Sequence, residues 1–296
     1  MPAPLRFIPS PALLNSAGLV LRPVCTARDL AAVADWASTL ESTTRRNTLA
    51  ACYLIEDKFA VRTLGLLACH RRAPREAEAT VELVLAENTS PEDESAFTET
   101  LAQLLAVSRH DPVAGKAISE KLATSGAGRA AHWCEQFGVP SNHVADHQLP
   151  LILEPMRLFN AGRDYVGRSL WLEHATRQDW LAMQAAAAAS SVMLDAVSGF
   201  RSIEYQAGIW RRKRDRGMTT ADILAINVPP GYSEHHSGRA LDITTPGCGA
   251  AEPEFAGTAA FEWLTRNAHR FGFVMSFPEN NIHGVMYEPW HWCHQG

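Results

Sequence analysis

The chain has 296 residues, of which 46% are hydrophobic and 20% charged, and its formal net charge is −5. At roughly 100–200 residues per domain, this length predicts two globular domains that bury real cores. Without a basic excess, neither nucleic acid nor an anionic membrane is expected as the main partner. No segment of the sequence approaches the roughly 18 apolar residues of a membrane span.

The N-terminus and the cysteines both favour the cytoplasm. Prolines interrupt the residues after Met1, so no apolar run of a secretory signal is visible there. The six cysteines are scattered without a CxxC pair, which is typical of reduced thiols in a chain of this length. We therefore expect a cytoplasmic bacterial protein. The sequence does not indicate its oligomeric state.

The first half of the chain reads as alternating strands and helices. Apolar runs predict strands at residues 19–24, 50–55, 64–69 and 79–85, with a hairpin turn at residues 56–58. Helical spacing predicts helices at residues 27–36 and 92–107, the second with Phe97, Leu101, Leu104 and Leu105 on one face. Further along we expect a strand at residues 116–123, a helix at 127–137 ending at Gly138, and a strand at 149–153.

This order of elements resembles the GNAT acyltransferase fold over about residues 17–153. The segment 128–138, with its final Phe-Gly pair, is similar to the late GNAT helix. In working GNAT domains a glycine-containing turn holds the coenzyme A pyrophosphate with backbone N–H groups. Residues 87–95 stand at that place; they contain no glycine, and four acidic side chains there would repel phosphates. We therefore expect a GNAT-like α/β domain at residues 1–153 without acetyl-CoA. A functional acetyltransferase and a different α/β domain are the alternatives.

Residues 154–169 are a predicted linker, because proline and glycine punctuate them and periodicity is lost. We expect a helix at residues 170–191, a short strand at 192–197, and a basic amphipathic helix at 203–216. The charges of that last helix are typical of a solvated face, although steering of acidic peptides is an alternative.

The segment Ser233-Glu-His-His-Ser-Gly-Arg-Ala-Leu-Asp242 can supply metal ligands. Gly238 can take a φ that other residues resist. Residues 239–244 alternate like a strand, with Leu241 and Ile243 toward the core and Asp242 on the opposite face beside the small Ala240. His235 arrives from the preceding loop. Only one of two neighbouring histidines can face a metal easily, so His236 is expected to be a bystander.

A second motif, Glu288-Pro-Trp-His291, lies near the C-terminus after an apolar strand predicted at residues 271–275 and a turn at 280–284. Pro289 disfavours a helix, so the pair is expected at a turn that leads into a strand. Two imidazoles and a carboxylate can hold zinc and leave a position for water. Glu288 is placed to take a proton from that water. The residues therefore predict a zinc peptidase. His283, in the turn, is expected to be a loop residue.

The pattern Ser-x-His-x-x-Gly-x-Ala-x-Asp, the upstream Ser198-Gly-Phe-Arg-Ser202 with Gln206, and Tyr-Glu-Pro-Trp-His resemble the VanY-type D-alanyl-D-alanine carboxypeptidases. These belong to the LAS group of metallopeptidases. The resemblance covers roughly residues 170–296 and implies an α+β fold, a small antiparallel sheet with flanking helices. The motifs themselves match over roughly residues 170–294, within a domain predicted at residues 170–296. The resemblance implies one zinc ion held by His235, Asp242 and His291.

The same resemblance implies that Glu288 is the base and that Arg201 holds a substrate carboxylate or carbonyl oxygen. Ser233 is expected either to contact substrate or to hold the loop, and Gln206, Tyr287 and Trp290 are expected at the substrate pocket. Ser276 and Cys293 depart from the family, which often carries arginine or another polar residue there. This leaves the zinc chemistry intact and the substrate open.

Three functions follow from these motifs. The leading one is a zinc carboxypeptidase that removes D-alanine from peptidoglycan peptides or muropeptides. The alternatives are a lytic endopeptidase on the same scaffold and a binding protein with a degenerate site. D,D-cleavage, L,D-cleavage and hydrolysis of D-Ala-D-Ala are not separated by the sequence, and the role of the first domain is open.

Overall fold

The structure is a computed structural model that describes residues 12–24, 48–58, 62–71, 79–85, 94–108 and 111–296. Contacts divide the chain into two compact units, Met1–Ser119 and Glu120–Gly296. The boundary lies inside one continuous helix, α4 (Pro112–Phe137). No helix within the described ranges is both long and apolar enough to span a bilayer.

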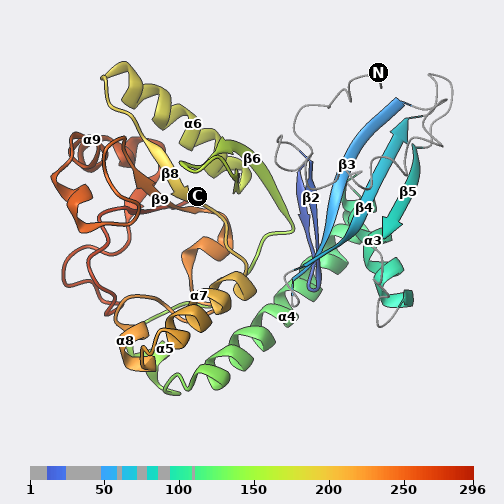
Figure 1. Ribbon diagram of the computed structural model, residues 1–296, viewed down its shortest axis with the longest axis horizontal. Coiled ribbons are helices and arrows are strands. Elements are labelled where there is room, and N and C mark those ends of the chain that lie inside the picture. Colours follow the sequence, from blue (N-terminus) through green and yellow to red (C-terminus); the bar gives the residue numbers. More distant parts are fainter. Residues whose placement is uncertain (1–11, 25–47, 59–61, 72–78, 86–93, 109–110) are drawn as a thin grey trace. The chain divides into compact units, whose positions relative to one another are not determined.

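The first unit contains an antiparallel sheet in the order β5-β4-β3-β2-β1 (Figure 1). Its strands are β1 (Leu13–Asn15), β2 (Leu19–Pro23), β3 (Thr48–Asp57), β4 (Arg62–Arg71) and β5 (Ala79–Leu85). The four strands predicted for this region are confirmed, and so is the hairpin, because β3 and β4 pair antiparallel around it. Lys58 secures its turn, since Nζ donates to Asn15 Oδ1 at 3.0 Å.

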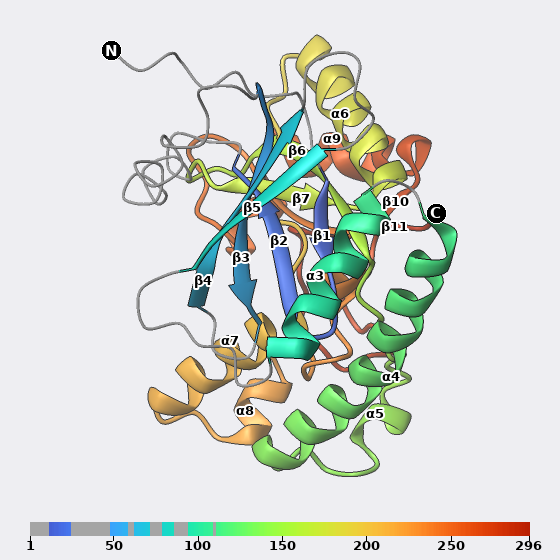
Figure 2. The ribbon, with the colours of Figure 1, turned by 90° about the vertical axis from the view of Figure 1, so that its right-hand side faces the viewer.

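Helix α3 (Glu94–Ser108) lies along one face of this sheet (Figure 2). It confirms the helix expected at residues 92–107 as far as the structure describes that segment. Phe97, Leu101 and Leu104 are buried on its inner face, as their spacing predicts, and Leu105 is half-buried. The helix predicted at residues 27–36 and the acidic turn at residues 87–93 lie outside the described residues.

Two strands predicted at the end of the GNAT-like order are wrong. Residues 116–123 belong to helix α4, where Ile118, Leu122 and Ala130 are buried at multiples of four positions. The helix ends where expected, at Gly138 with φ of +66°. Residues 149–153 form no strand; Ile152 N donates to Gly231 O at 2.8 Å, but no ladder extends from it. The GNAT-like assignment is therefore not confirmed and stays a prediction.

The second unit contains an antiparallel sheet in the order β10-β11-β9-β8 with helices around it. This agrees with the small antiparallel sheet and flanking helices that were expected. The sheet strands are β8 (Asp195–Ser198), β9 (Ala240–Thr244), β10 (Phe273–Met275) and β11 (His291–His294). The helices after α4 are α5 (His143–Asp146), α6 (His174–Ala189), α7 (Ile203–Asp215), α8 (Thr220–Leu224) and α9 (Ala259–Asn267). Shorter 3-10 turns are η2 (Glu234–Ser237), η3 (Pro253–Gly257) and η4 (Ala268–Phe271).

The predicted linker and the start of the following helix are corrected by a hairpin. Strands β6 (Arg157–Arg163) and β7 (Ser169–Leu172) pair antiparallel, with Phe159 opposite Leu172. Helix α6 begins only after Glu173, whose carboxylate accepts hydrogen bonds from the N–H groups of residues 175 and 176. Residues 170–172 were expected to begin the helix because they are apolar. They are instead buried as part of β7, where they pair with β6.

Within the second unit, α6 and α9 lie on one side of the sheet, while α7 and α8 lie next to each other on its other side (Figures 1 and 2). The main core joins α6 and α9 to the sheet through Trp180, Met183, Leu241, Ile243 and Leu264. A smaller core joins the end of α4 to α7 and α8 through Phe137, Trp210 and Ile223. The sheet face opposite the main core is thus turned toward α7.

Candidate metal and substrate site

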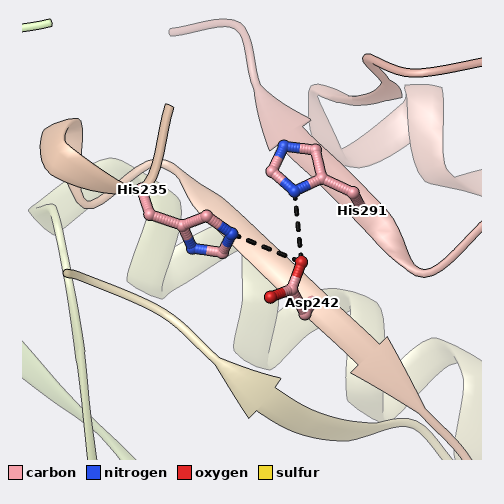
Figure 3. A group of neighbouring side chains, drawn as sticks. All are labelled: His235, Asp242 and His291. Atoms are coloured by element: carbon pink, nitrogen blue, oxygen red, sulfur yellow. Dashed lines mark hydrogen bonds and ion pairs between the residues drawn. The ribbon is translucent and has the colours of Figure 1, made fainter. Parts of the chain in front are cut away.

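Three buried side chains, His235, Asp242 and His291, converge from separate elements (Figure 3). His235 comes from turn η2, Asp242 from β9 and His291 from the start of β11. One ligand atom from each lies within 4.8 Å of the other two, a spacing at which three such groups could hold a metal ion. Sequence analysis predicted these same three residues as the ligands.

The pairing of two strands brings two of the ligands together. Asp242 and His291 are directly opposite each other in the β9–β11 ladder, and facing side chains in such a pair are close. Leu241 and Ile243 point into the main core, as the alternation predicts, so Asp242 points the other way. The Glu288-Pro-Trp-His291 segment is a turn that leads into a strand, also as expected.

The third ligand depends on a glycine. Gly238 ends turn η2 with φ of +71°, and a Cβ on it would lie 2.5 Å from Leu158 Cδ2. Gly238 O accepts a hydrogen bond from Glu173 N at 2.9 Å, and His235 O accepts one from Arg201 N at 3.1 Å. The loop that carries His235 is therefore fixed on both sides by backbone bonds.

Each histidine keeps one ring nitrogen for the group and uses the other elsewhere. His235 Nδ1 lies 2.7 Å from Gly199 O, so it carries the proton and leaves Nε2 facing Asp242 Oδ1 at 3.3 Å. His291 Nδ1 faces the same Asp242 oxygen at 3.1 Å. Two imidazole nitrogens and a carboxylate oxygen make a donor set that suits zinc.

Charge at the site is concentrated and buried. Although burial acts to raise it, the pKa of Asp242 lies well below its usual range because of His235 and Arg201. Burial acts to lower the pKa of His291, but hydrogen bonds to Asp242 and Glu234 raise it to about 10. Burial lowers the pKa of His235 to about 4. Asp242 is thus an anion, and His235 is neutral as a metal ligand must be.

Glu288 lies beside this group, with Oε2 3.9 Å from His291 Nδ1. Burial raises the pKa of Glu288 to about 7, and repulsion from Asp242 acts in the same direction. A carboxyl group with a pKa near neutrality can both accept and return a proton at physiological pH. The geometry places Glu288 where a base for metal-site chemistry is expected.

Arg201 enters the site from the loop before α7. Its guanidinium contacts the Asp242 carboxylate and lies 2.9 Å from His235 Nε2, while Nε donates to Ser198 Oγ at 2.8 Å. A guanidinium and a metal cation would compete for the same two acceptors on Asp242 and His235. A positive group therefore lies directly at the candidate metal site, and its Nε contact with Ser198 does not involve those acceptors.

A cavity of about 530 Å³ opens onto this group. Besides the three ligands, Glu288 and Arg201, it is lined by Gln206, Ser233 and Trp290. Gln206 Nε2 donates to Val228 O at 3.1 Å, and Oε1 is buried without a partner. In the described part of the chain the Ser233 hydroxyl makes no hydrogen bond. Tyr287 is half-buried and is not among the lining residues, so its substrate role stays a prediction.

Two other histidines behave as structural residues. His236 is fully buried; Nδ1 donates to Arg201 O at 2.7 Å and Nε2 accepts from Gly231 N at 3.0 Å. Burial lowers the pKa of His236 to about 4, so the ring is neutral. His283 Nδ1 bonds the backbone oxygen of His147 at 3.0 Å. Neither ring joins the metal-ligand group.

Sequence analysis missed Glu234. Its Oε2 lies 2.8 Å from His291 Nε2, and it lines the cavity. The sequence carried one signal, an acidic residue directly before a ligand histidine. Its partner is 57 positions away, however, and no local pattern connects them.

Comparison with known proteins assigns the domain that carries this site. Residues 169–296 match the family model described as VanY, D-alanyl-D-alanine carboxypeptidase. Residues 169–296 form a VanY-type domain. The matched region contains all three candidate ligands, Glu288 and Arg201, so the LAS-type resemblance of the C-terminal half is confirmed. The match begins after the first unit and leaves the GNAT-like assignment without support.

Curated relatives are similar over part of their length. A D-alanyl-D-alanine carboxypeptidase of Enterococcus faecalis is 35% identical over 121 residues, which are 38% of this chain and 43% of the relative. The putative carboxypeptidase YodJ of Bacillus subtilis is 37% identical over 101 residues, 33% of this chain and 37% of the relative. The chain thus spans less than half the length of these two relatives. A solved structure of the LdcB LD-carboxypeptidase has 28% identity and a TM-score of 0.45, covering 50% of this chain and 72% of that one.

Proposed function

We propose that this protein is a zinc-dependent carboxypeptidase that removes a C-terminal D-alanine from peptidoglycan peptides. One observation carries the proposal. Within a VanY-type domain, a buried His-Asp-His group shares a cavity with a carboxyl group whose pKa is near 7 and with a guanidinium. The named relatives are carboxypeptidases, which supports the same reaction class.

The donor set supports zinc as the metal. His235 Nε2, an Asp242 oxygen and His291 Nδ1 are the three groups that would hold it. Catalytic zinc sites in proteins use three such ligands and keep one position open. When bound, zinc would lower the pKa of its water to about 7 and would also polarise the scissile carbonyl.

Glu288 acts as general base and then as general acid in this proposal. Its carboxylate accepts a proton from the attacking water and returns it to the nitrogen of the departing D-alanine. Its pKa of about 7 suits both steps, because the group is easily converted between its two forms at neutral pH. Burial keeps bulk water from competing for that proton.

Arg201 explains why the last residue of a peptide would be removed. A guanidinium pairs with a carboxylate through two parallel hydrogen bonds. Because Arg201 lies directly at the ligand group, a substrate C-terminus bound there puts its final amide bond at the site. Gln206 adds an unpartnered buried oxygen that can accept an N–H of the substrate backbone.

We place the reaction in the cytoplasm, with a soluble precursor or a recycled muropeptide as substrate. Free thiols at Cys134, Cys248 and Cys293 support a reducing compartment. The same site would accept a peptide that ends in D-Ala-D-Ala, a peptide whose final D-alanine follows an L-configured centre, or the free dipeptide D-Ala-D-Ala. All three carry the terminal carboxylate that Arg201 would bind.

Mass spectrometry of peptides incubated with the zinc-loaded protein tests the proposal. The substrates are a stem pentapeptide, a tetrapeptide and D-Ala-D-Ala. Release of a single terminal D-alanine from at least one of them is expected, and the preferred substrate assigns D,D- or L,D-specificity. Solubilisation of purified sacculi without release of D-alanine would instead indicate an endopeptidase. Stoichiometric zinc without any turnover would contradict catalysis and indicate a binding protein.

A further inference from the structure

Glu234 links the two histidines of the site, since it precedes His235 in the chain and contacts His291 in space. Glu234 Oε2 lies 2.8 Å from His291 Nε2. The imidazole is 3% exposed and the Glu234 side chain 28% exposed, so the contact is shielded from most solvent. An acceptor at this distance requires the proton of the ring to be on Nε2.

That proton position decides what His291 can do. With Nε2–H donated to Glu234, the ring nitrogen that can give up its proton to a metal ion and supply a lone pair is Nδ1, which faces Asp242 Oδ1 at 3.1 Å. Nδ1 is the atom that points into the ligand group. The opposite tautomer would turn an N–H toward that group, and His291 could not act as a ligand.

Two further polar side chains lie near Glu234. Although burial acts to raise it, the pKa of the Glu234 carboxyl is lowered to about 2, chiefly by His291 and in part by Ser276. Burial and the nearby Glu234 carboxylate both raise the pKa of the Cys293 thiol. Cys293 lies two positions after His291 on β11, and hence on the same face of the sheet. The two positions at which the chain departs from the family pattern thus both lie near enough to Glu234 to interact with it electrostatically.

The other histidine lacks such a carboxylate. His235 Nδ1 donates to a backbone oxygen, Gly199 O, at 2.7 Å. Outer partners of both kinds orient metal-bound histidines, and a carboxylate also makes the ring a stronger donor to the metal. The two rings are therefore supported differently, and the charged support belongs to His291 alone.

We propose that Glu234 is a positioning residue that holds His291 in the tautomer with Nδ1 free and thereby strengthens metal binding at His235, Asp242 and His291. This inference rests on the metal site of the proposed function and is independent of which peptide is cleaved. It concerns metal affinity, which can be measured without substrate.

The test compares zinc affinity of the full-length wild type with that of Glu234→Gln, by competition with a chromophoric chelator. Glutamine keeps the size of the side chain and removes the charge. Glu252→Gln is the matched control, because Glu252 lines the same cavity, is exposed and makes no ion pair with His291. Glu234→Gln is expected to weaken zinc binding by about 10–100-fold, while the control binds like the wild type.

Visible absorption of the cobalt-substituted proteins gives a readout that a folding defect alone would not change. Glu234→Gln should shift the cobalt bands, and Glu234→Asp, which keeps the charge, should recover part of the affinity. Equal zinc affinity and identical cobalt spectra in Glu234→Gln and wild type would overturn the inference and leave the proposed function standing. A wild type that binds no zinc would overturn both, whereas zinc binding that depends on Glu234 without peptide cleavage would overturn the proposed function alone.

Discussion

His236 shows how a residue beside the ligands supports them without joining them. Its two ring nitrogens bond the backbone of Arg201 and of Gly231. The first bond fixes the residue whose guanidinium reaches the site, and the second fixes the loop that leads into η2. A neutral ring satisfies both bonds at once, in agreement with its lowered pKa.

We predict that His236→Ala lowers the free energy of unfolding by about 1–3 kcal/mol for each backbone group left without a partner. His236→Gln, which can still donate and accept, should retain more of the stability. Urea denaturation of the metal-free proteins measures both changes. If the alanine variant is as stable as the wild type, the buried ring does not support the Arg201 loop.

At this scale the sequence predicts which three side chains converge, but it does not predict their neighbours; their role as ligands stays a prediction. His235, Asp242 and His291 are recognisable because family motifs fix their identity and order. Glu234 stands inside the same motif, but its function depends on a contact with a strand 57 positions later. Tertiary structure decides that contact, so spacing could not reveal it.

Among the elements, α4 is joined by buried charges to the start of α7, next to the site. Arg129 of α4 is 7% exposed, and its Nη1 lies 2.7 Å from Glu204 at the start of α7 and 3.3 Å from Glu154. Glu154 also accepts a hydrogen bond from Ile203 N at 2.8 Å. The N-terminus of α7, directly after Arg201 and Ser202, is thus joined to α4 by buried charges.

We predict that Arg129→Met destabilises the protein by about 3–5 kcal/mol, because it removes one partner of a buried ion-pair cluster. The matched control is Arg266→Met, which breaks an exposed pair with Glu262 and should cost about 0–1 kcal/mol. Chemical denaturation of the full-length variants gives both values. Similar losses in the two variants would show that the buried cluster contributes no more than a surface pair.

Where the element predictions are wrong, tertiary contacts explain the error. Residues 116–123 have apolar side chains at positions 118 and 122, a helical spacing that the surrounding glycines and polar residues obscure. Residues 157–163 look like a linker because their pairing partner, β7, lies outside the segment. Strand β9 was easier to predict, since an apolar alternation directly follows Gly238, and β8 overlaps the short strand expected at residues 192–197.

In the whole molecule, the region matched by the family model and the compact unit that carries the site begin at different residues. The VanY-type region begins at residue 169, whereas the unit begins at residue 120. Residues 120–156 contribute Arg129 and Glu154, and Ala130 packs against Gly231, where a Cβ would lie 2.2 Å from the Ala130 Cβ. The domain limits predicted from the sequence stay a prediction, as does a role of the first domain in substrate choice.

The central claim is that a zinc site and Glu288 together hydrolyse the final peptide bond, and Glu288→Gln tests it most directly. Zinc content and release of D-alanine from the preferred peptide are measured on the wild type, the chelator-treated wild type and the variant. The variant is expected to bind one zinc ion like the wild type but to release D-alanine about 10²–10⁴-fold more slowly, and the chelated protein is expected to regain activity when zinc is added. A zinc-loaded Glu288→Gln variant that releases D-alanine at the wild-type rate would contradict it.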